Sequence, residues 1–441
     1  MLIGFKVKNF RSFGELEHFS MLAGKIRNNE NHIIERNGKK ILKFSGIFGA
    51  NGSGKSNLIM AISIIKDLFN NGLMLLDENQ YYRGKSGDAK KNSYFEYEIE
   101  VNNKLYSYGF ELNFSKKELV SEWLIDMTKP KEKIIFERDL KKKTYITSIK
   151  EKNEYFSTCL KELANNTSIL FLFEMTRRIV MSNNKDNFFI DLLSVFNFLI
   201  NDMIIIKPTS HKLLPLNYVD NKNIIIKYLN ILDINIDDIK SETSDLSTIR
   251  SKMSDRDYSK FIDDFEVVSK ISKIDSCTLR IRNDLYVVSK DENNKFIVKS
   301  LEFMHDNSEY SFSAYDESDG TIRILELLDI LLTDNKVYLI DELDSSLHPL
   351  LVEGLLKLFL ESNNTNQLII TTHESKTLDF DLVRRDEVWF TEKNNEGSTR
   401  IYSLEEFKEV ARFDRKIDKA YLEGRFGSVP NINLGIITSR N

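Results

Sequence analysis

Several features are scarce in this chain of 441 residues, and each scarcity excludes a class of protein. Only two cysteines occur, Cys159 and Cys277, which is too few for a disulfide framework, and no CxxC pair indicates a metal site. No apolar run approaches the ~20 residues that a helix needs to span a bilayer. Residues 1–10 alternate like a strand and lack the apolar block of a signal peptide. We therefore expect a cytoplasmic protein with reduced thiols and no membrane partner.

An excess of positive charge is also missing. Lysine and arginine number 62 against 67 aspartates and glutamates, which gives a net charge of −5. No overall basic field therefore draws the chain onto nucleic acid, and a DNA contact would need a local basic patch. Hydrophobic residues make up 41% and charged residues 29%, which is ordinary for a soluble globular protein. The length suits one large or two medium domains.

A glycine-rich loop between a strand and a helix is the strongest signal. Residues 41–48 are typical of a buried strand, Gly49-Ala-Asn-Gly-Ser-Gly-Lys-Ser56 matches GxxxxGK[ST] in full, and 57–69 has helical spacing. This context disfavours a glycine turn without a ligand. The loop would bring backbone N–H groups and the positive helix end to phosphates. We expect Lys55 to reach the β- and γ-phosphates of ATP and Ser56 to bind Mg²⁺. The other predicted nucleotide contacts are Gly49, Asn51, Gly52, Ser53, Gly54 and Asn57.

Two further strands end in groups that suit phosphate chemistry. Residues 336–340 are a buried strand followed by Asp341 and Glu342, at the carboxyl edge where open α/β sheets bind ligands. Asp341 would hold Mg²⁺ through water, and Glu342 would orient or deprotonate the attacking water. Residues 367–372 are another buried strand, and His373 behind it would hydrogen-bond the γ-phosphate. Of the other histidines, His18, His32, His211 and His305 receive no role, and His348 is expected to shape a loop.

The remaining segments are expected to surround this core. Alternation over 94–138 predicts a β-meander with a hairpin turn at Asn102-Asn103. Residues 155–265 are largely helical by pattern, interrupted at 203–208, and show no heptad run long enough for a coiled-coil arm. Strand-like alternation returns over 278–315. Lys55 and Asp341 lie much further apart than a compact nucleotide core requires, so a large insertion must separate their motifs.

Together these motifs resemble a known family. Asn9-Phe-Arg-Ser-Phe13, Gly49–Ser56, Ser318-Asp-Gly320, Leu339–His348 and Thr371-Thr-His373 resemble the ABC-class ATPases of the RecF, SMC and OLD type. Within that class the chain is most similar to AAA-family ATPases of bacterial phage-defence and abortive-infection operons, whose ending the tail at 415–430 also resembles. The resemblance covers about residues 1–140 and 300–432.

This resemblance implies an α/β fold, an ABC-type ATPase head with a mixed P-loop sheet and an antiparallel β-meander. The implied segments are 1–150 and 301–441 for the head, with 151–300 as a mainly helical insertion for partner or assembly contacts. Glu317–Thr321 stands at the signature motif, so Ser318 and Gly320 would contact a γ-phosphate held by a second subunit. Ser318 is also a plain helix N-cap in this pattern. The other correspondences are Asp344 at the D-loop, Glu342 as catalytic glutamate, His373 as switch histidine, and Asn9 and Arg11 near the nucleotide.

Two departures from the family stand out. Gln80 and Gln367 are the only glutamines, and neither lies where a Q-loop glutamine should follow the second core strand. The sequence therefore does not indicate which residues would transmit the nucleotide state to the insertion. OLD nucleases carry a C-terminal Toprim domain with a clustered acidic metal site, and too few residues follow His373 for such a domain. We therefore do not expect this chain to be a nuclease itself.

The resemblance implies an ATP-driven switch that assembles as a homodimer or higher homo-oligomer through ATP-sandwich heads. It would control a separate effector, a nuclease or toxin, in anti-phage defence. The alternative is a RecF- or SMC-like DNA-binding ATPase in repair or maintenance; a transporter subunit is disfavoured by the long insertion. The basic residues available for DNA are Arg384, Arg385, Arg412, Arg415, Lys416, Lys419 and Arg425, although a solvated helix face is the simpler interpretation.

Overall fold

The computed structural model describes residues 1–26, 28–149, 154–182, 187–208, 213–214, 218–244, 246–272, 276–281, 284–291, 293–306, 308–407 and 417–429. The chain divides into two compact units. Unit 1 comprises Met1–Ile205, Val337–Glu342 and Gln367–Asn441, and unit 2 comprises Ile206–Lys336 and Leu343–Asn366. These boundaries do not coincide with the segments 1–150, 151–300 and 301–441, a division that stays a prediction.

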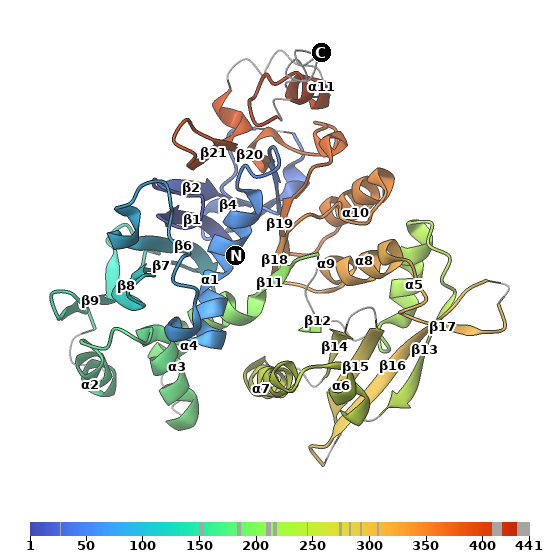
Figure 1. Ribbon diagram of the computed structural model, residues 1–441, viewed down its shortest axis with the longest axis horizontal. Helices are drawn as coiled ribbons and strands as arrows, with labels where there is room; N and C mark the ends of the chain where they lie inside the picture. The colour runs from blue at the N-terminus through green and yellow to red at the C-terminus, as the bar shows by residue number, and fades with distance from the viewer. Residues whose placement is uncertain are drawn as a thin grey trace, which may run out of the picture. The chain divides into compact units, whose positions relative to one another are not determined.

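A six-stranded sheet forms the centre of unit 1 and draws its strands from distant parts of the chain (Figure 1). Its order is β11 (Met203–Ile206), β18 (Val337–Ile340), β19 (Gln367–Thr371), β5 (Phe44–Phe48), β20 (Val388–Lys393) and β21 (Thr399–Ser403). The strands from β18 to β20 run parallel, and β21 is antiparallel to β20. Every residue of β5, β18 and β19 is buried, which explains their nearly continuous apolar sequences.

The predicted strand at 41–48 is divided in two. Residues Lys39–Leu42 form β4, which pairs with β3 (Ile33–Arg36), while β5 begins at Phe44. Lys43 between them is buried, and its backbone carbonyl accepts a hydrogen bond from Leu368 N on β19. The chain therefore passes from a small hairpin into the central sheet within one residue, a change that an uninterrupted apolar pattern does not reveal.

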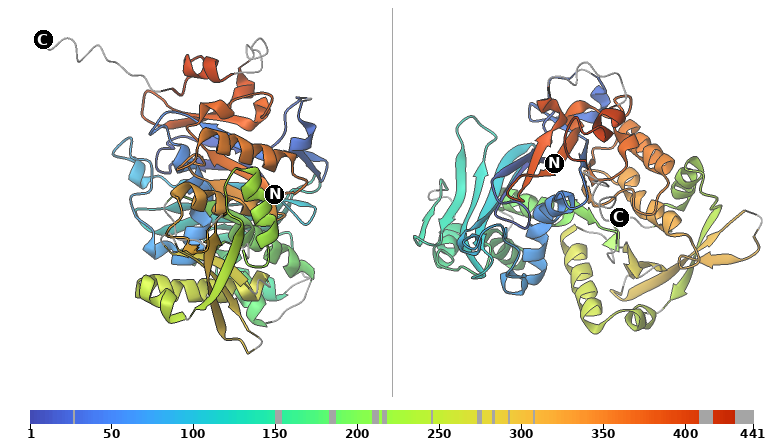
Figure 2. Two further views of the ribbon diagram at one scale, coloured as in Figure 1. Left: turned by 90° about the vertical axis from the view of Figure 1, so that its right-hand side faces the viewer. Right: turned by 45° about the horizontal axis from the view of Figure 1, so that its top comes forward.

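The predicted β-meander is confirmed as the larger part of a seven-stranded antiparallel sheet, whose long cyan strands lie side by side in Figure 2. Its order is β10 (Thr144–Ile146), β9 (Lys133–Asp139), β8 (Glu118–Asp126), β7 (Lys104–Asn113), β6 (Ser93–Val101), β1 (Leu2–Lys8) and β2 (Glu17–Ser20). The turn between β6 and β7 lies at Asn102 and Asn103, with φ of 51° and 62°. Left-handed conformations at both positions are typical of a tight hairpin.

Helix α1 (Lys55–Asn71) follows the glycine-rich loop, as predicted, and buries its apolar stripe in unit 1. Phe69 near its end packs edge-on against Phe173 and Phe196, with ring centroids 5.3 Å and 5.2 Å away. The other helices of unit 1 are α2 (Glu154–Glu162), α3 (Phe171–Ser182), α4 (Asn187–Asn197) and α11 (Asp418–Leu422). The predicted helical stretch after the meander is thus confirmed up to β11, and it packs on α1.

A buried ion pair joins the meander to these helices. Arg138 on β9 and Glu122 on β8 are both fully buried, and Arg138 Nη2 lies 2.6 Å from Glu122 Oε2. Glu122 also accepts the backbone N–H groups of Phe171 and Leu172, the first two residues of α3. Arg138 donates to the carbonyls of Leu163 and Ile169. Each charge is thus surrounded by hydrogen-bond partners, the condition under which a buried ion pair is tolerated.

Unit 2 combines helices with a second antiparallel sheet. Its strands are β12 (Leu213–Leu214), β14 (Ser276–Ile281), β15 (Asp284–Lys290), β16 (Phe296–Met304) and β13 (Asp238–Ser244), with β17 (Ser311–Ser313) beside β16. Its helices are α5 (Lys222–Ile231), α6 (Leu246–Lys252), α7 (Asp255–Ser272), α8 (Asp319–Leu327), α9 (Asp329–Leu332) and α10 (Pro349–Glu361). The strand-like pattern over 278–315 is confirmed, whereas β13 lies within the stretch expected to be largely helical. The insertion therefore contains a sheet as well as helices.

A compact apolar cluster holds α6 and α7 on this sheet. Ile249 and Phe261 from the helices meet Leu279, Tyr286 and Val288 from the strands. Cys277 belongs to the same cluster, where burial raises the pKa of its thiol. Both cysteines are buried and free, as the sequence led us to expect.

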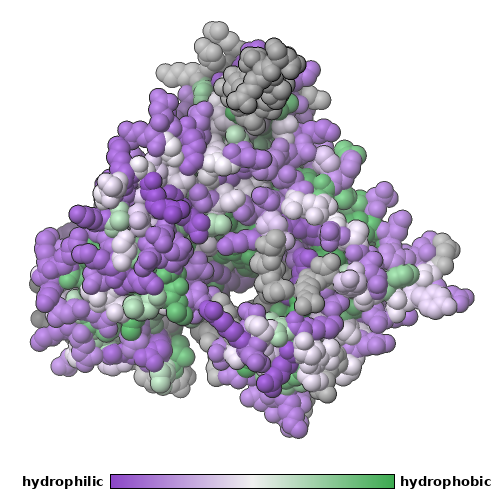
Figure 3. Space-filling view, in the orientation of Figure 1, coloured by the Kyte–Doolittle hydropathy of each residue, from purple (hydrophilic) through white to green (hydrophobic). Residues whose placement is uncertain are grey.

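The surface drawn in Figure 3 is mainly hydrophilic, and apolar side chains appear on it in small groups. Within the described ranges, no helix has the length and apolar character needed to traverse a bilayer.

We expect Arg138→Met to lower the free energy of unfolding by about 3–5 kcal/mol, because Glu122 would stay buried without its cation. Urea unfolding followed through Trp123, the neighbour of Glu122 on β8, measures the change. Lys142→Met is the matched control, since it removes the exposed ion pair with Asp139 on the same hairpin. A surface pair contributes little, so equal shifts in the two variants would contradict the importance of the buried pair.

Candidate functional site

The glycine-rich loop leaves the carboxyl end of β5 and enters α1 without a side-chain cap. Gly54 precedes the helix with φ of 117° and ψ of 9°, a conformation that a residue with a Cβ rarely adopts. A Cβ at Gly54 would also lie 2.3 Å from Thr399 Oγ1. Gly54 has no side chain with which to cap the first N–H groups of α1, an arrangement that suits anion binding.

Two strands on the far side of β5 brace this loop. Ser53 Oγ lies 2.7 Å from Thr391 Oγ1 on β20, and Thr399 Oγ1 on β21 donates to the Ser53 carbonyl at 2.7 Å. Asn57 Nδ2, in the first turn of α1, donates to Ser12 Oγ at 2.8 Å. Ser12, Thr391 and Thr399 were not among the predicted residues, because no local pattern distinguishes a threonine that contacts a loop over 300 positions away.

The predicted residues Lys55 and His373 lie together in the structure. Lys55 is 5% exposed, and its Nζ donates to the carbonyls of Gly49 at 2.7 Å and Ala50 at 3.2 Å. The same nitrogen is 3.4 Å from His373 Nδ1. His373 itself is exposed just beyond β19. The loop cation and the histidine thus face one space at the carboxyl edge of the sheet.

The two predicted carboxylates follow β18, directly beside β19. Asp341 is buried, and its Oδ1 accepts a hydrogen bond from Thr371 Oγ1 at 2.6 Å. The backbone N–H of Glu342 donates to the same hydroxyl at 2.8 Å. Glu342 has a φ of 50°, so the chain turns out of strand geometry at this residue. Because β18, β19 and β5 are parallel and in register, these carboxylates and the glycine-rich loop lie at one sheet edge.

The other predicted loop residues are distributed between the loop tip and the helix. Asn51 and Gly52 are exposed, Ser53 is buried, and Ser56 and Asn57 are half-buried in α1. Hydroxyl and carboxylate oxygens are the ligands that Mg²⁺ prefers, so Ser56 and Asp341 suit that ion chemically. In the part of the chain that the structure describes, no three histidine, cysteine or acidic side chains are grouped so as to hold a metal ion.

Asn9, which was expected near the nucleotide, is buried. Its Nδ2 donates to the carbonyls of Asp88 and Lys91, at 3.4 Å and 3.1 Å. The residue therefore fixes the loop before β6. Arg11, by contrast, lines a polar cavity of about 500 Å³ together with Ser12, Asn57, Tyr81, Tyr82 and Arg83.

Unit 2 carries the predicted signature and D-loop residues. Ser318 caps α8, since its Oγ accepts the N–H of Thr321 at 3.0 Å. A Cβ at Gly320 would lie 2.9 Å from the carbonyl oxygen of Ser346, in the loop that contains Asp344. The start of α8 and this loop are therefore in close contact. His348 caps α10 by accepting the N–H of Leu350, which confirms the expected structural role.

His305, which received no role from the sequence, holds the residue before Ser318. Its Nε2 lies 2.6 Å from Glu317 Oε1, and its Nδ1 lies 2.6 Å from the carbonyl oxygen of Asn235. Burial lowers the pKa of His305, but the hydrogen bonds to Glu317 and Asn235 outweigh it and raise the pKa overall. A second contact joins Arg280 on β14 to Glu326 on α8 at 2.6 Å. The inserted sheet is thus bonded to both ends of α8.

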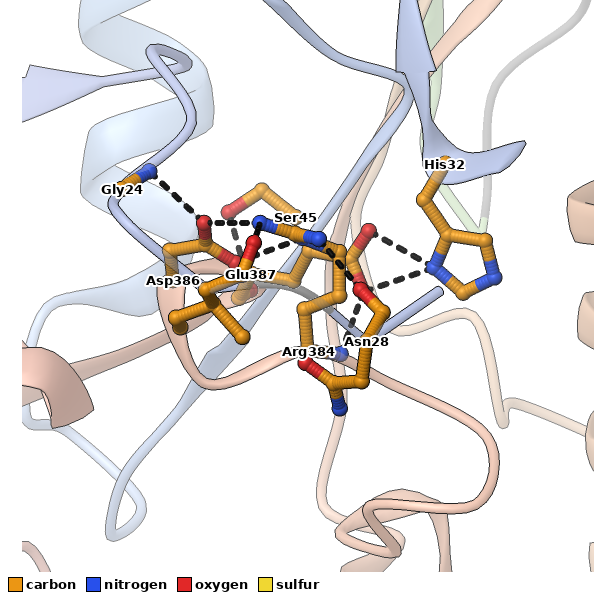
Figure 4. A network of polar contacts seen from close by, with 8 residues as sticks. Gly24, Asn28, His32, Ser45, Arg384, Asp386 and Glu387 are labelled. Atoms are coloured by element: carbon orange, nitrogen blue, oxygen red, sulfur yellow. Dashed lines mark hydrogen bonds and ion pairs between the residues drawn. The ribbon is translucent and has the colours of Figure 1, made fainter. Parts of the chain in front are cut away.

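The basic residues considered for DNA binding are only partly accessible. Arg384 is fully buried, and its guanidinium donates to both carboxylate oxygens of Asp386 and to the carbonyl of Asn28 (Figure 4). It therefore cannot contact DNA, and it also does not lie on the solvated helix face that the sequence favoured. In the same network His32 bonds Glu387, whose pKa is raised by burial despite that contact. Of the others, Lys419 and Arg425 are exposed, and Arg412, Arg415 and Lys416 lie outside the described residues.

A mixed, largely parallel sheet that presents a GxxxxGK[ST] loop, an Asp-Glu pair and a histidine at one edge, beside an antiparallel meander, is the ATPase head of the ABC class. A family model matches residues 44–211 and 219–379, which is most of the chain. The chain belongs to this family, which is described as "AAA domain, putative AbiEii toxin, Type IV TA system". The resemblance to ABC-class AAA ATPases of abortive-infection systems is thereby confirmed.

Solved structures of SMC heads also match. An SMC head bound to the C-winged helix domain of ScpA is 13% identical, with 91% of this chain and 97% of that chain covered and a TM-score of 0.42. The SMC head domain from Thermotoga maritima is 13% identical, with coverage of 91% and 98% and a TM-score of 0.33. An SMC head with an extended coiled coil, bound to the C-terminal domain of ScpA derived from Pyrococcus furiosus, is 14% identical, with coverage of 93% and 98% and a TM-score of 0.34. No curated protein matches the sequence.

We expect Gly54→Ala to abolish nucleotide binding and to lower the unfolding temperature, because the new methyl group would meet Thr399 in a conformation that excludes a Cβ. Gly52→Ala is the matched control. Gly52 also has a positive φ, 75°, but nothing lies within 4 Å of a Cβ there, so only the backbone cost of roughly 1–2 kcal/mol applies. Thermal unfolding without nucleotide and titration with a fluorescent ATP analogue test both variants. Equal unfolding temperatures in the two would show that Thr399 does not constrain the loop.

Proposed function

We propose that this chain binds ATP with Mg²⁺, hydrolyses the ATP, and acts as a switch that controls a separate effector in anti-phage defence. The observation that carries the proposal is the convergence of Lys55, His373 and the Asp341-Glu342 pair at one edge of the central sheet. The description of the family to which the chain belongs names an "AAA domain" and a "putative AbiEii toxin, Type IV TA system".

The geometry supports a binding mode for each part of ATP. The phosphates would lie over the loop from Gly49 to Ser56, where Lys55 would exchange its bonds to the Gly49 and Ala50 carbonyls for phosphate oxygens. The cavity beside α1, lined by Arg11, Tyr81 and Tyr82, suits the base and ribose, because aromatic and guanidinium groups stack on a purine. The loop is already braced by Thr391 and Thr399, so little ordering would be required on binding.

Hydrolysis would use the carboxylates and the histidine. Mg²⁺ bound by Ser56 and Asp341 would neutralise charge on the phosphate oxygens. Glu342 would accept a proton from the attacking water, the role of a general base. His373, within reach of Lys55, would hydrogen-bond the γ-phosphate and so distinguish ATP from ADP.

A second copy of the chain would complete the site. Ser318 and Asp319 at the start of α8 are exposed, and Asp344 lies in the adjoining loop. The exposed helix end is suited to the γ-phosphate bound by a partner head, which would make dimerisation depend on ATP. ATP binding would then favour one assembly over another, and hydrolysis would reverse the shift.

The alternative function, a DNA-binding ATPase of repair or maintenance, has less support. Arg384 is buried in an ion pair, and Arg425 is paired with Glu423. The net charge of −5 provides no general attraction to DNA. A steep fall of DNA affinity with salt would favour this alternative, because phosphate contacts release counterions.

We expect Glu342→Gln to bind ATP with wild-type affinity and to hydrolyse it roughly 10²-fold more slowly, since the amide cannot accept a proton from water. Steady-state phosphate release and nucleotide titration measure the two effects. Lys55→Ala serves as the contrasting variant, in which ATP binding itself should be lost. Undiminished turnover in Glu342→Gln would remove that residue from its proposed role.

The same Glu342→Gln protein tests the effector, because it should accumulate in the ATP-bound assembly. A tagged copy is recovered from its own host cells with and without phage infection. A protein that co-purifies before infection and is released by it supports the switch. Recovery of DNA together with repair proteins, and no dedicated partner, favours the alternative.

Ser318→Arg should leave ATP binding intact and prevent the ATP-dependent dimer, because a bulky cation would occupy the place of the partner's γ-phosphate. Light scattering of each protein with ATP in the Glu342→Gln background gives the mass. Ser308→Arg is the control and should still dimerise, because Ser308 is a half-buried serine whose hydroxyl donates to the Tyr310 carbonyl just before β17. A dimer of normal mass in Ser318→Arg would contradict the proposed role of α8.

A further inference from the structure

We infer that Thr371 is a positioning residue for ATP hydrolysis, because its one hydroxyl holds both the Asp341 carboxylate and the backbone of Glu342. This inference rests on the proposed function. Thr371 is the last residue of β19 and is fully buried. Thr371 received no functional role from the sequence, because the two carboxylates that it contacts, Asp341 and Glu342, follow a different strand, β18.

The hydrogen bonds at Thr371 have a defined direction. A hydroxyl has one proton and two lone pairs. The Glu342 N–H can only donate, so it uses a lone pair of Thr371 Oγ1, at 2.8 Å. The hydroxyl proton is therefore available to Asp341 Oδ1, 2.6 Å away. This bond fixes the rotation of the Asp341 side chain, whose carboxylate is one of the two proposed ligands of Mg²⁺.

The bond to Glu342 acts on the backbone. A φ of 50° is disfavoured for a residue with a Cβ, and it persists only where the surroundings hold it. The Thr371 hydroxyl provides such a contact at the peptide nitrogen of Glu342. The φ angle at Glu342 determines the direction in which its side chain projects. Loss of the Thr371 hydroxyl would therefore leave the side chains of both Glu342, the proposed general base, and Asp341 without a fixed orientation.

Thr371 also lies next to the strand that leads into the phosphate loop. In the parallel pairing of β19 with β5, Thr371 stands opposite Ile47, and Ile47 lies two residues before Gly49. Its β-branched side chain has restricted rotation, so the position of the hydroxyl follows the backbone of β19. Thr371 thereby links the positions of the two carboxylates to the register of β19 with β5, the strand that leads into the phosphate loop.

Thr372 provides a matched comparison at the next position. It is equally buried, and its Oγ1 accepts the N–H of Glu374 at 2.9 Å. Replacement of either threonine by valine removes a buried hydroxyl with little change in volume. Only the Thr371 hydroxyl is hydrogen-bonded to Asp341 and Glu342, so the two substitutions separate general destabilisation from positioning.

The test compares Thr371→Val, Thr371→Ser and Thr372→Val in the full-length protein. The first readout is hydrogen exchange at the Glu342 amide without nucleotide. The second is ATP binding in EDTA, and the third is the Mg²⁺ concentration for half-maximal hydrolysis together with kcat. Thermal unfolding confirms that each variant is folded.

For Thr371→Val we expect faster exchange at Glu342, ATP affinity in EDTA within about twofold of wild type, and loss of Mg²⁺ affinity and kcat by roughly 10–100-fold. Thr371→Ser should restore all three, and Thr372→Val should keep the wild-type Mg²⁺ dependence. If Thr371→Val does not fold, Thr371→Ala is measured in its place with the same expectations.

Unchanged exchange at Glu342 and unchanged Mg²⁺ dependence in the hydroxyl-free variant would overturn the inference. So would an equal loss in Thr372→Val, which would indicate general destabilisation. A wild-type protein that binds no ATP in the presence of Mg²⁺ would contradict the proposed function instead. The two failures are distinguishable because the exchange readout requires neither nucleotide nor hydrolysis.

Discussion

The parallel register of β18, β19 and β5 is the constraint on which the rest of unit 1 depends. Ile340 stands opposite Ile370, and Thr371 opposite Ile47, so the three strands end within two residues of one another. Each strand is fully buried and largely apolar, and the polar groups that follow the strands lie at one edge. A shift of one strand by a single residue would exchange the faces of its side chains and separate the groups.

Buried hydroxyls hold this edge together across large distances in sequence. Thr391 and Thr399 contact Ser53, and Thr371 contacts Asp341 and Glu342. Each hydroxyl would cost free energy if it were buried without a partner, so each bond selects one arrangement of neighbouring strands and loops. The N-terminal segment is held in a similar way by Arg384 and Asp386, which bind the backbone of Asn28 and Gly24 (Figure 4).

Unit 2 shows how an inserted sheet is attached to α8. Glu317 before the helix bonds His305, and Glu326 near its end bonds Arg280. Tyr218 also donates to the carbonyl of Leu325 in α8. The sheet therefore contacts the helix through charged and hydrogen-bonded groups at several points, and the position of the helix end at Ser318 depends on contacts from the insertion.

The sequence alone determined the parts of the protein that are encoded locally. The apolar strands, the glycine-rich loop before α1, the meander and its Asn102-Asn103 turn follow from periodicity and turn chemistry, which neighbouring residues specify. The tertiary structure alone decided the burial of Asn9 and Arg384, the strand β13 within a helical pattern, and the contacts of Thr371, Thr391 and His305. These features depend on partners far away in the chain, and a single hydroxyl or imidazole carries no local signal of the group that it will contact.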